Sequence, residues 1–158
     1  SIGRAKEHLY RTAQEMNEEL SGVRAYVSVN KALVTQSSAA IPVVPLYFAI
    51  LYKVMKKAGN HENCIQQIAR LFTQKLYTPT GFQTDENGFI RMDDYELTPE
   101  IQEKVKKCWK AVTTDTVKEY CDIDGYWEDF YHMFGFRYED IDYTQDVDAD
   151  IEIDGVVM

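Results

Sequence analysis

Lys6 and the junction between a polar loop and an apolar segment are the features of this sequence that could carry chemistry. Lys6 follows Ser1-Ile2-Gly3 and lies one turn into an expected helix. Its ammonium could meet a sugar or a phosphate there, although a single lysine is usually just solvated. Further along, the polar residues 30–38 run directly into the apolar, aromatic-rich residues 39–55. This junction could bring a polar ligand and an apolar chain together; the alternative is a loop that enters a core helix.

The histidines and cysteines indicate neither a metal site nor a disulfide framework. His61-Glu62 has no second histidine four residues later, so the pattern of helical zinc proteases is absent. The three cysteines are odd in number and widely spaced, which favours a reducing, cytoplasmic setting. Cys64 is expected in the core, and His8 and His132 are expected to be surface or packing residues.

Charge is distributed unevenly along the 158 residues, which are enough for one domain or part of one. Residues 1–60 hold 8 Lys/Arg and 4 Glu, residues 61–137 hold 9 basic and 14 acidic side chains, and residues 138–158 hold 8 acidic and none basic. The net charge of -9 argues against nucleic acid as a partner, whereas the cationic first part could receive an anionic ligand. No signal peptide is visible, and the apolar run 39–52 is too short for a membrane span.

The acidic residues near the carboxyl end suggest a tail rather than a calcium loop. Asp146, Asp148, Asp150, Glu152 and Asp154 alternate with mostly apolar residues. A calcium loop starting at Asp146 or Asp148 would need a glycine at its sixth position and a glutamate at its twelfth, and neither is present. A solvated or edge-strand tail is therefore expected.

The spacing of apolar residues predicts the elements that must position these groups. Helices are expected over residues 3–20, 44–57, 61–77, 114–120 and 126–134, and another one after the Thr98-Pro99 cap. The helix over 61–77 is expected to bury a stripe of Ile65, Ile68, Leu71, Phe72 and Leu76. Residues 23–29 predict a parallel strand whose neighbours lie outside this chain. Asn87-Gly88 predicts a hairpin turn between residues 81–84 and 89–92.

Several segments resemble the trans-2-enoyl-CoA reductases and the closely related enoyl-acyl-carrier-protein reductases, and together they cover nearly the whole chain. They are SIGRAKEHL at residues 1–9, VSVNKALVT at 27–35, IPVVPLY at 41–47, KVMK at 53–56, GNHENCI at 59–65, RMDD at 91–94 and GFRYEDIDY at 135–143. The resemblance implies an α/β fold of the Rossmann type, similar to short-chain dehydrogenases, and a cytoplasmic enzyme of fatty acid metabolism that is a monomer at full length. It also implies that residues 1–158 are the mostly helical C-terminal portion of one enoyl reductase domain.

The resemblance implies NADH-dependent reduction of the C2–C3 double bond of an enoyl-CoA or enoyl-acyl-carrier-protein, with the CoA-linked branch the nearer one. Lys6 corresponds to the lysine that holds the nicotinamide ribose and helps a catalytic tyrosine, which would lie before Ser1. Hydride arrives at C3, an enolate develops at the thioester oxygen, and a phenol beside a cation can stabilise or protonate it. Leu33, Val34 and Thr35 match a cofactor-contact segment in which backbone amides and a hydroxyl are suitable donors.

On this interpretation the apolar helix lines the acyl pocket. Val44, Phe48 and Tyr52 are spaced i, i+4 and i+8 on one helical face, and the alternative is that all three are core residues. The family's glycine-rich cofactor loop is absent from these residues, so the 158-residue chain alone is expected to be inactive. A competing hypothesis is a non-enzymatic helical module that binds a partner through its acidic tail or its apolar helix.

Overall fold

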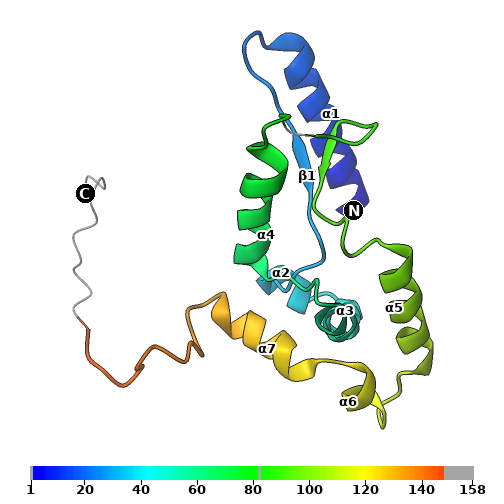
Figure 1. The fold of residues 1–158 in the computed structure, drawn as a ribbon, viewed down its shortest axis with the longest axis vertical. Helices are drawn as coiled ribbons and strands as arrows, with labels where there is room; N and C mark the ends of the chain where they lie inside the picture. The colour runs from blue at the N-terminus through cyan, green and yellow to red at the C-terminus, as the bar shows by residue number, and fades with distance from the viewer. Residues whose placement is uncertain (1, 82, 148–158) are drawn as a thin grey trace.

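The computed structural model describes residues 2–81 and 83–147, which form a mostly helical structure with one small sheet (Figure 1). Helices and a π-helical turn make up most of the described residues. The elements are α1 (Ile2–Glu19), β1 (Val27–Val29), α2 (Gln36–Ala39), α3 (Val44–Ala58), α4 (Cys64–Arg70), the π-helix η1 (Leu71–Leu76), β2 (Phe89–Arg91), α5 (Pro99–Ala111), α6 (Val117–Tyr120) and α7 (Ile123–His132).

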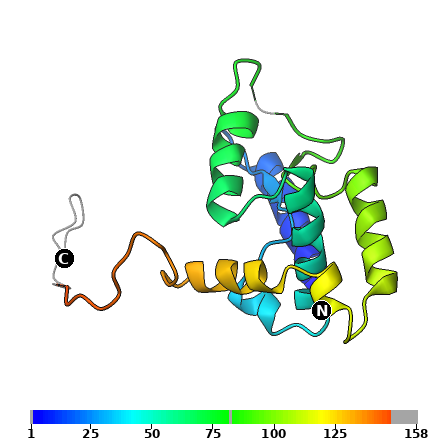
Figure 2. The same cartoon turned by 60° about the horizontal axis from the view of Figure 1, so that its bottom comes forward.

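The central helix α3 confirms the prediction for residues 44–57. Pro45 lies in its first turn, where the missing N–H costs no helical hydrogen bond, and Gly59 ends it with a φ of 74°. Its side chains Ile50, Leu51, Tyr52 and Met55 are fully buried. Helix α3 packs against α5 and α7 (Figure 1 and Figure 2), and the three helices share one apolar cluster.

The two helices against α3 begin close to where they were expected. Thr98 caps α5 and Pro99 occupies its first turn, as predicted, and α5 buries Ile101 and Val105. Asp122 caps α7 by accepting the Gly125 N–H, and its own N–H donates to the carbonyl of Ala49 on α3 at 2.8 Å. This backbone contact fixes the start of α7 against the middle of α3.

The two strands form a parallel pair, which corrects two predictions. Val27 pairs with Phe89 and Val29 with Arg91, so the first strand finds a neighbour within this chain. Asn87 and Gly88 do lie in a turn, closed by the Gly88 N–H on the Asp85 carbonyl at 3.0 Å. The Asp85 N–H also bonds the Phe89 carbonyl at 2.9 Å across this turn, but the predicted hairpin is wrong because β2 forms its strand pairing with β1.

The helix predicted over residues 61–77 is shorter and buries a different face. It begins at Cys64 after the cap Asn63 and widens into a π-helix at Leu71. Its buried residues are Gln67 and Arg70, whereas Ile65, Ile68 and Phe72 of the predicted stripe are exposed, Ile65 to 72%. The predicted apolar spacing is present, but the structure turns the polar side inward, where Arg70 pairs with the buried Glu62 and the partly exposed Asp94.

Helix α1 follows the predicted boundaries but buries no residue. Its contacts run to the sheet region, where Tyr10 packs on Phe89 with ring centroids 4.6 Å apart and the Asn17 side chain bonds the backbone of Ala25. None of the helices in the described ranges is long and apolar enough to cross a membrane. The predicted acidic tail lies outside the described residues from position 148 on.

Candidate functional site

A cavity of about 690 Å³ lies between the segment after β1, helix α3, the start of α4 and the region around the end of α7. Its lining joins residues that were predicted to serve different ligands. Leu33 and Val34 come from the predicted cofactor segment, and Tyr52 comes from the predicted acyl face of α3. The other lining residues are Asn63, Cys64, Ile65, Asp129, His132, Met133 and Tyr138.

The remaining predicted site residues do not line this cavity. Lys6 is exposed on α1, and Thr35 is exposed where it caps α2. Phe48 is buried in the core, and Val44 is half-buried against the same cluster. The structure therefore unites Leu33, Val34 and Tyr52 at one cavity, and the roles of all seven predicted residues stay predictions.

Backbone amides of the predicted cofactor segment are already engaged within the protein. The Val34 N–H donates to the Tyr52 hydroxyl at 3.0 Å, and the Thr35 N–H donates to the Ser38 Oγ at 2.8 Å. In return, the Ser38 N–H donates to the Thr35 Oγ1 at 3.0 Å. These two amides therefore shape the segment and do not point at a ligand, in contrast to the donor role expected for them.

Charged and aromatic groups surround the fully buried Tyr52. The His61 ring meets the Tyr52 ring edge-on with centroids 4.4 Å apart, and the Lys31 ammonium lies 5.2 Å from the Tyr52 centroid. Burial, the Asp129 charge and hydrogen bonding to Asp129 raise the pKa of Tyr52 well above its ordinary value, so the phenol stays protonated. Burial likewise raises the pKa of Asp129, against the opposing effects of Tyr52 and of Lys56.

Lys31 is a buried cation behind this part of the cavity. It is 2% exposed, and its ammonium donates to the Ala32 carbonyl at 3.1 Å. Burial lowers the pKa of Lys31 to about 8, although Glu96, Glu62 and Asp129 each raise it. Glu96 also accepts the Ala32 N–H at 2.6 Å, so the backbone that leads into the predicted cofactor segment is held from both sides.

The low pKa of His61 keeps its ring neutral at pH 7. It predicts that the stability of the protein depends on pH. Burial, with Lys31 and Lys56 nearby, lowers the pKa of His61 to about 4. A histidine in the unfolded chain titrates at about 6.5, so the unfolded state gains its proton first as the pH falls. The free energy of unfolding is therefore expected to fall by roughly 2 kcal/mol between about pH 6.5 and pH 4 on account of this group.

Urea unfolding at pH 7.5, 6 and 5 measures this effect, with His61→Gln as the comparison. The glutamine variant cannot take up a proton, so its stability should depend less on pH than that of the natural protein. Equal pH dependence in the two proteins would show that His61 titrates normally.

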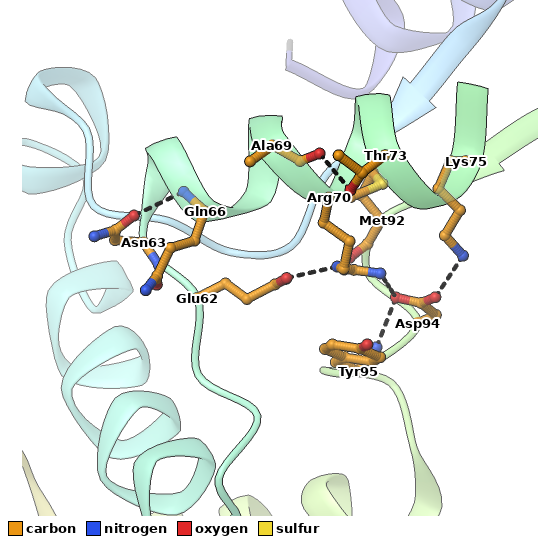
Figure 3. A network of polar contacts seen from close by, with 10 residues as sticks. All are labelled: Glu62, Asn63, Gln66, Ala69, Arg70, Thr73, Lys75, Met92, Asp94 and Tyr95. Atoms are coloured by element: carbon orange, nitrogen blue, oxygen red, sulfur yellow. Dashed lines mark hydrogen bonds and ion pairs between the residues drawn. The ribbon is translucent and has the colours of Figure 1, made fainter. Parts of the chain in front are cut away.

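A network of polar contacts anchors α4, whose start forms one wall of the cavity (Figure 3). The Arg70 side chain donates to Glu62 at 2.6 Å, to Asp94 at 2.9 Å and to the Met92 carbonyl at 2.8 Å. Asp94 also accepts from Lys75 at 2.6 Å. Burial alone lowers the pKa of Arg70, but its hydrogen bonds to Glu62 and Asp94 raise it above the ordinary value. Arg70 thus joins α4 to the residues that follow β2.

Several lining residues were missed or misplaced by sequence reasoning. Cys64 was expected in the core but is exposed at the cavity. His132 packs as expected, stacking on Tyr138 with ring centroids 4.4 Å apart, but its place in the cavity lining was not predicted. Asp129 carried no sequence signal, because an acidic residue in an amphipathic helix is normally solvated. The described residues contain no cluster of potential metal ligands.

Comparison with known proteins finds enoyl reductases along nearly the entire chain. A family model described as the trans-2-enoyl-CoA reductase catalytic region matches residues 1–77, and one described as the enoyl reductase FAD binding domain matches residues 84–147. The chain is 48% identical to the enoyl-[acyl-carrier-protein] reductase [NADH] of Flavobacterium psychrophilum over 99% of its own length. The chain belongs to the enoyl reductase family.

Solved structures of the family agree with this assignment. The trans-2-enoyl-CoA reductase of Clostridium acetobutulicum in complex with NADH superposes with a TM-score of 0.87 and 48% identity over 93% of this chain and 38% of its own. The Treponema denticola enzyme in complex with NAD gives a TM-score of 0.86 over 92% of this chain and 37% of its own. This enoyl reductase chain spans 40% of the length of the curated relatives it matches.

The family comparison confirms the resemblance read from the sequence. It does not separate the two carriers, because the trans-2-enoyl-CoA reductase [NADH] of Ruminiclostridium cellulolyticum is also 48% identical over 99% of this chain and 40% of its own length. The two regions matched by the family models pack together in the enoyl reductase structure. Helix α3 from the first shares its apolar cluster with α5 and α7 from the second.

Proposed function

We propose that the protein containing this chain is an NADH-dependent reductase of the C2–C3 double bond of trans-2-enoyl thioesters in fatty acid metabolism. The observation that carries the proposal is the cavity in which Leu33 and Val34, from the cofactor segment, meet Tyr52 from the predicted acyl face. The names of the relatives, which specify NADH and enoyl substrates, support it. The complete fold is proposed to be of the Rossmann type, similar to short-chain dehydrogenases.

The cavity wall suits a ligand that is part apolar and part polar. Leu33, Val34 and Met133 offer apolar surface, whereas Asp129 and His132 offer polar groups in the same lining. An acyl chain and a nicotinamide ring with its carboxamide have this combination of surfaces. NADH, when bound, supplies the hydride; the residues of this chain bind and orient the reactants and exclude water from them.

Lys6 is proposed to hold the nicotinamide ribose and to stabilise negative charge that develops on the thioester oxygen. Its ammonium is exposed on α1, so it is available to a ligand. A cation placed next to a developing oxyanion lowers the barrier because it acts more strongly on the transition state than on the neutral substrate. Lys6 thus has an electrostatic role that a methionine of similar length could not fulfil.

The direct test is an assay of the full-length enzyme, in which the loss of NADH absorbance follows each turnover. Crotonyl-CoA and crotonyl-acyl-carrier-protein are compared at equal concentrations, and a higher kcat/KM with crotonyl-CoA is expected from the resemblance to the CoA-linked branch. Reduction is confirmed by the mass of the saturated product. If neither thioester is reduced at the expense of NADH, the proposed function is wrong.

Tyr52→Ala is expected to change the chain-length preference of the full-length enzyme. Removing the ring enlarges the cavity where Tyr52 lines it, so longer acyl chains should gain relative to crotonyl-CoA, by about 10-fold in the ratio of kcat/KM values. Steady-state kinetics with four-, six- and eight-carbon enoyl-CoA substrates measure the ratio. An unchanged preference would show that Tyr52 does not line the acyl pocket.

A further inference from the structure

The Tyr52 hydroxyl forms a hydrogen bond with the backbone that a phenylalanine ring at the same position could not form. Tyr52 lies on α3 and is fully buried, yet its oxygen accepts the N–H of Val34 at 3.0 Å, in the segment between β1 and α2. Residue 34 follows the end of β1, so no sheet partner is available for this amide in the parallel pair. The Val34 N–H is therefore bonded by the Tyr52 hydroxyl and not by a neighbouring strand of this pair.

Asp129 gives this hydroxyl a defined orientation. Asp129 and Tyr52 line the same cavity, and the Asp129 carboxylate lies 3.9 Å from Nε2 of His61, whose ring packs against Tyr52. Burial and the nearby Asp129 charge raise the pKa of the phenol, so the hydroxyl keeps its proton. A protonated phenol can donate to the carboxylate and at the same time accept the Val34 N–H. Helix α7 is thereby connected through one side chain of α3 to the segment after β1.

The ring of Tyr52 is enclosed, so its oxygen has little freedom to move. The His61 ring packs edge-on against it at 4.4 Å between centroids, and the Lys31 ammonium lies over it at 5.2 Å. The groups facing the phenol are thus Asp129 from α7, His61 from the loop before α4 and Lys31 from the segment after β1.

The geometry points to Tyr52 as a positioning residue for the cofactor segment: its hydroxyl, oriented by Asp129, holds the Val34 backbone in place at the cavity. This inference rests on the proposed function, because it takes residues 33–35 to contact NADH. It differs from the acyl-pocket role of the same residue, since the ring would line the pocket and only the hydroxyl would hold the segment.

Tyr52→Phe in the full-length enzyme separates the two roles. Phenylalanine keeps the ring and removes the acceptor, which leaves a buried N–H without its partner. The dissociation constant for NADH, measured by fluorescence titration, and the KM for NADH are expected to rise about five- to thirty-fold, the size that losing such a contact produces. The ratio of kcat/KM between six-carbon and four-carbon enoyl-CoA should stay within about twofold of the natural value, because the ring that lines the pocket is still present.

Tyr126→Phe is the matched control. Tyr126 is also buried, lies on α7, and its hydroxyl has no hydrogen-bond partner among the described residues. Its removal should therefore leave NADH binding unchanged. If Tyr52→Phe binds NADH as tightly as Tyr126→Phe does, the hydroxyl does not position the cofactor segment and the inference is wrong.

Variants of Asp129 test the other half of the contact. Asparagine retains an oxygen that can accept the Tyr52 O–H, whereas leucine of similar size cannot. Asp129→Leu should weaken NADH binding, whereas Asp129→Asn should bind NADH nearly as tightly as the natural enzyme. Equal NADH affinities in the two variants would exclude the orienting role of Asp129.

Amide hydrogen exchange tests this inference independently of the proposed function. Protection of the Val34 amide, measured by NMR or by mass spectrometry of peptides, requires neither substrate nor cofactor, and Tyr52→Phe should reduce it about tenfold or more. A natural enzyme that fails to oxidise NADH overturns the proposed function. A Val34 amide that keeps its full protection in Tyr52→Phe overturns the inference, whatever the activity.

Discussion

Arg70→Met is expected to lower the free energy of unfolding of the full-length protein by about 3–5 kcal/mol, because it leaves a buried carboxylate without its partner. Arg70 is 5% exposed and holds Glu62, Asp94 and the Met92 carbonyl together. Methionine fills most of the same space but offers no donors to these three oxygen-bearing groups. Urea unfolding monitored by circular dichroism measures the loss.

The control for this prediction removes the charge that arginine neutralises. In Glu62→Gln the buried carboxylate becomes a neutral amide, so the double variant with Arg70→Met should be less destabilised than the sum of the two single changes. Arg70→Lys keeps the charge but loses the planar set of donors, and an intermediate stability is expected. Additive effects of Arg70→Met and Glu62→Gln would mean that the two side chains are not energetically coupled.

Lys6→Met is expected to lower kcat of the full-length enzyme by about 10²- to 10⁴-fold, the usual contribution of a group that assists proton transfer. The change should leave folding nearly unaffected, since Lys6 is exposed and α1 buries no residue among those described. Stopped-flow measurement of NADH oxidation with saturating crotonyl-CoA gives the chemical step directly.

Lys57→Met serves as the comparison for Lys6. Lys57 is an exposed lysine in the last turn of α3, and it does not line the cavity. Its replacement removes the same charge at a distance from the proposed chemistry, so kcat should change by less than about twofold. Similar losses in both variants would point to a general charge effect and remove Lys6 from the proposed site.

The elements with strong local signals were predictable from the sequence. Helix α3 has prolines at its start, a continuous apolar body and Gly59 at its end, and α5 has the Thr98-Pro99 cap. These signals act within a few residues, so they are present in the sequence itself. The identity of β2 depends instead on β1, about 60 residues earlier, and three residues after an Asn-Gly turn do not reveal a parallel partner.

The candidate site was predictable in part for the same reason. Leu33 and Val34 were predicted by family resemblance and Tyr52 by its position on an apolar helical face; all three line the cavity, and their roles stay predictions. Asp129 becomes a site residue only because α7 folds onto α3, and Arg70 becomes buried only because Glu62 and Asp94 converge on it. Such partnerships arise from tertiary contacts, which override the helical pattern of a single segment.

The parallel pairing of β1 and β2 has a consequence for how the chain folds. Parallel strands need a long connection, and here that connection contains α3 and α4, which also form walls of the cavity. Closing the strand pair early would cost the entropy of a loop of about 60 residues, so we expect α3 and its neighbours to collapse first and shorten that loop. The strand pair and the cavity would then form in the same late, cooperative step of folding.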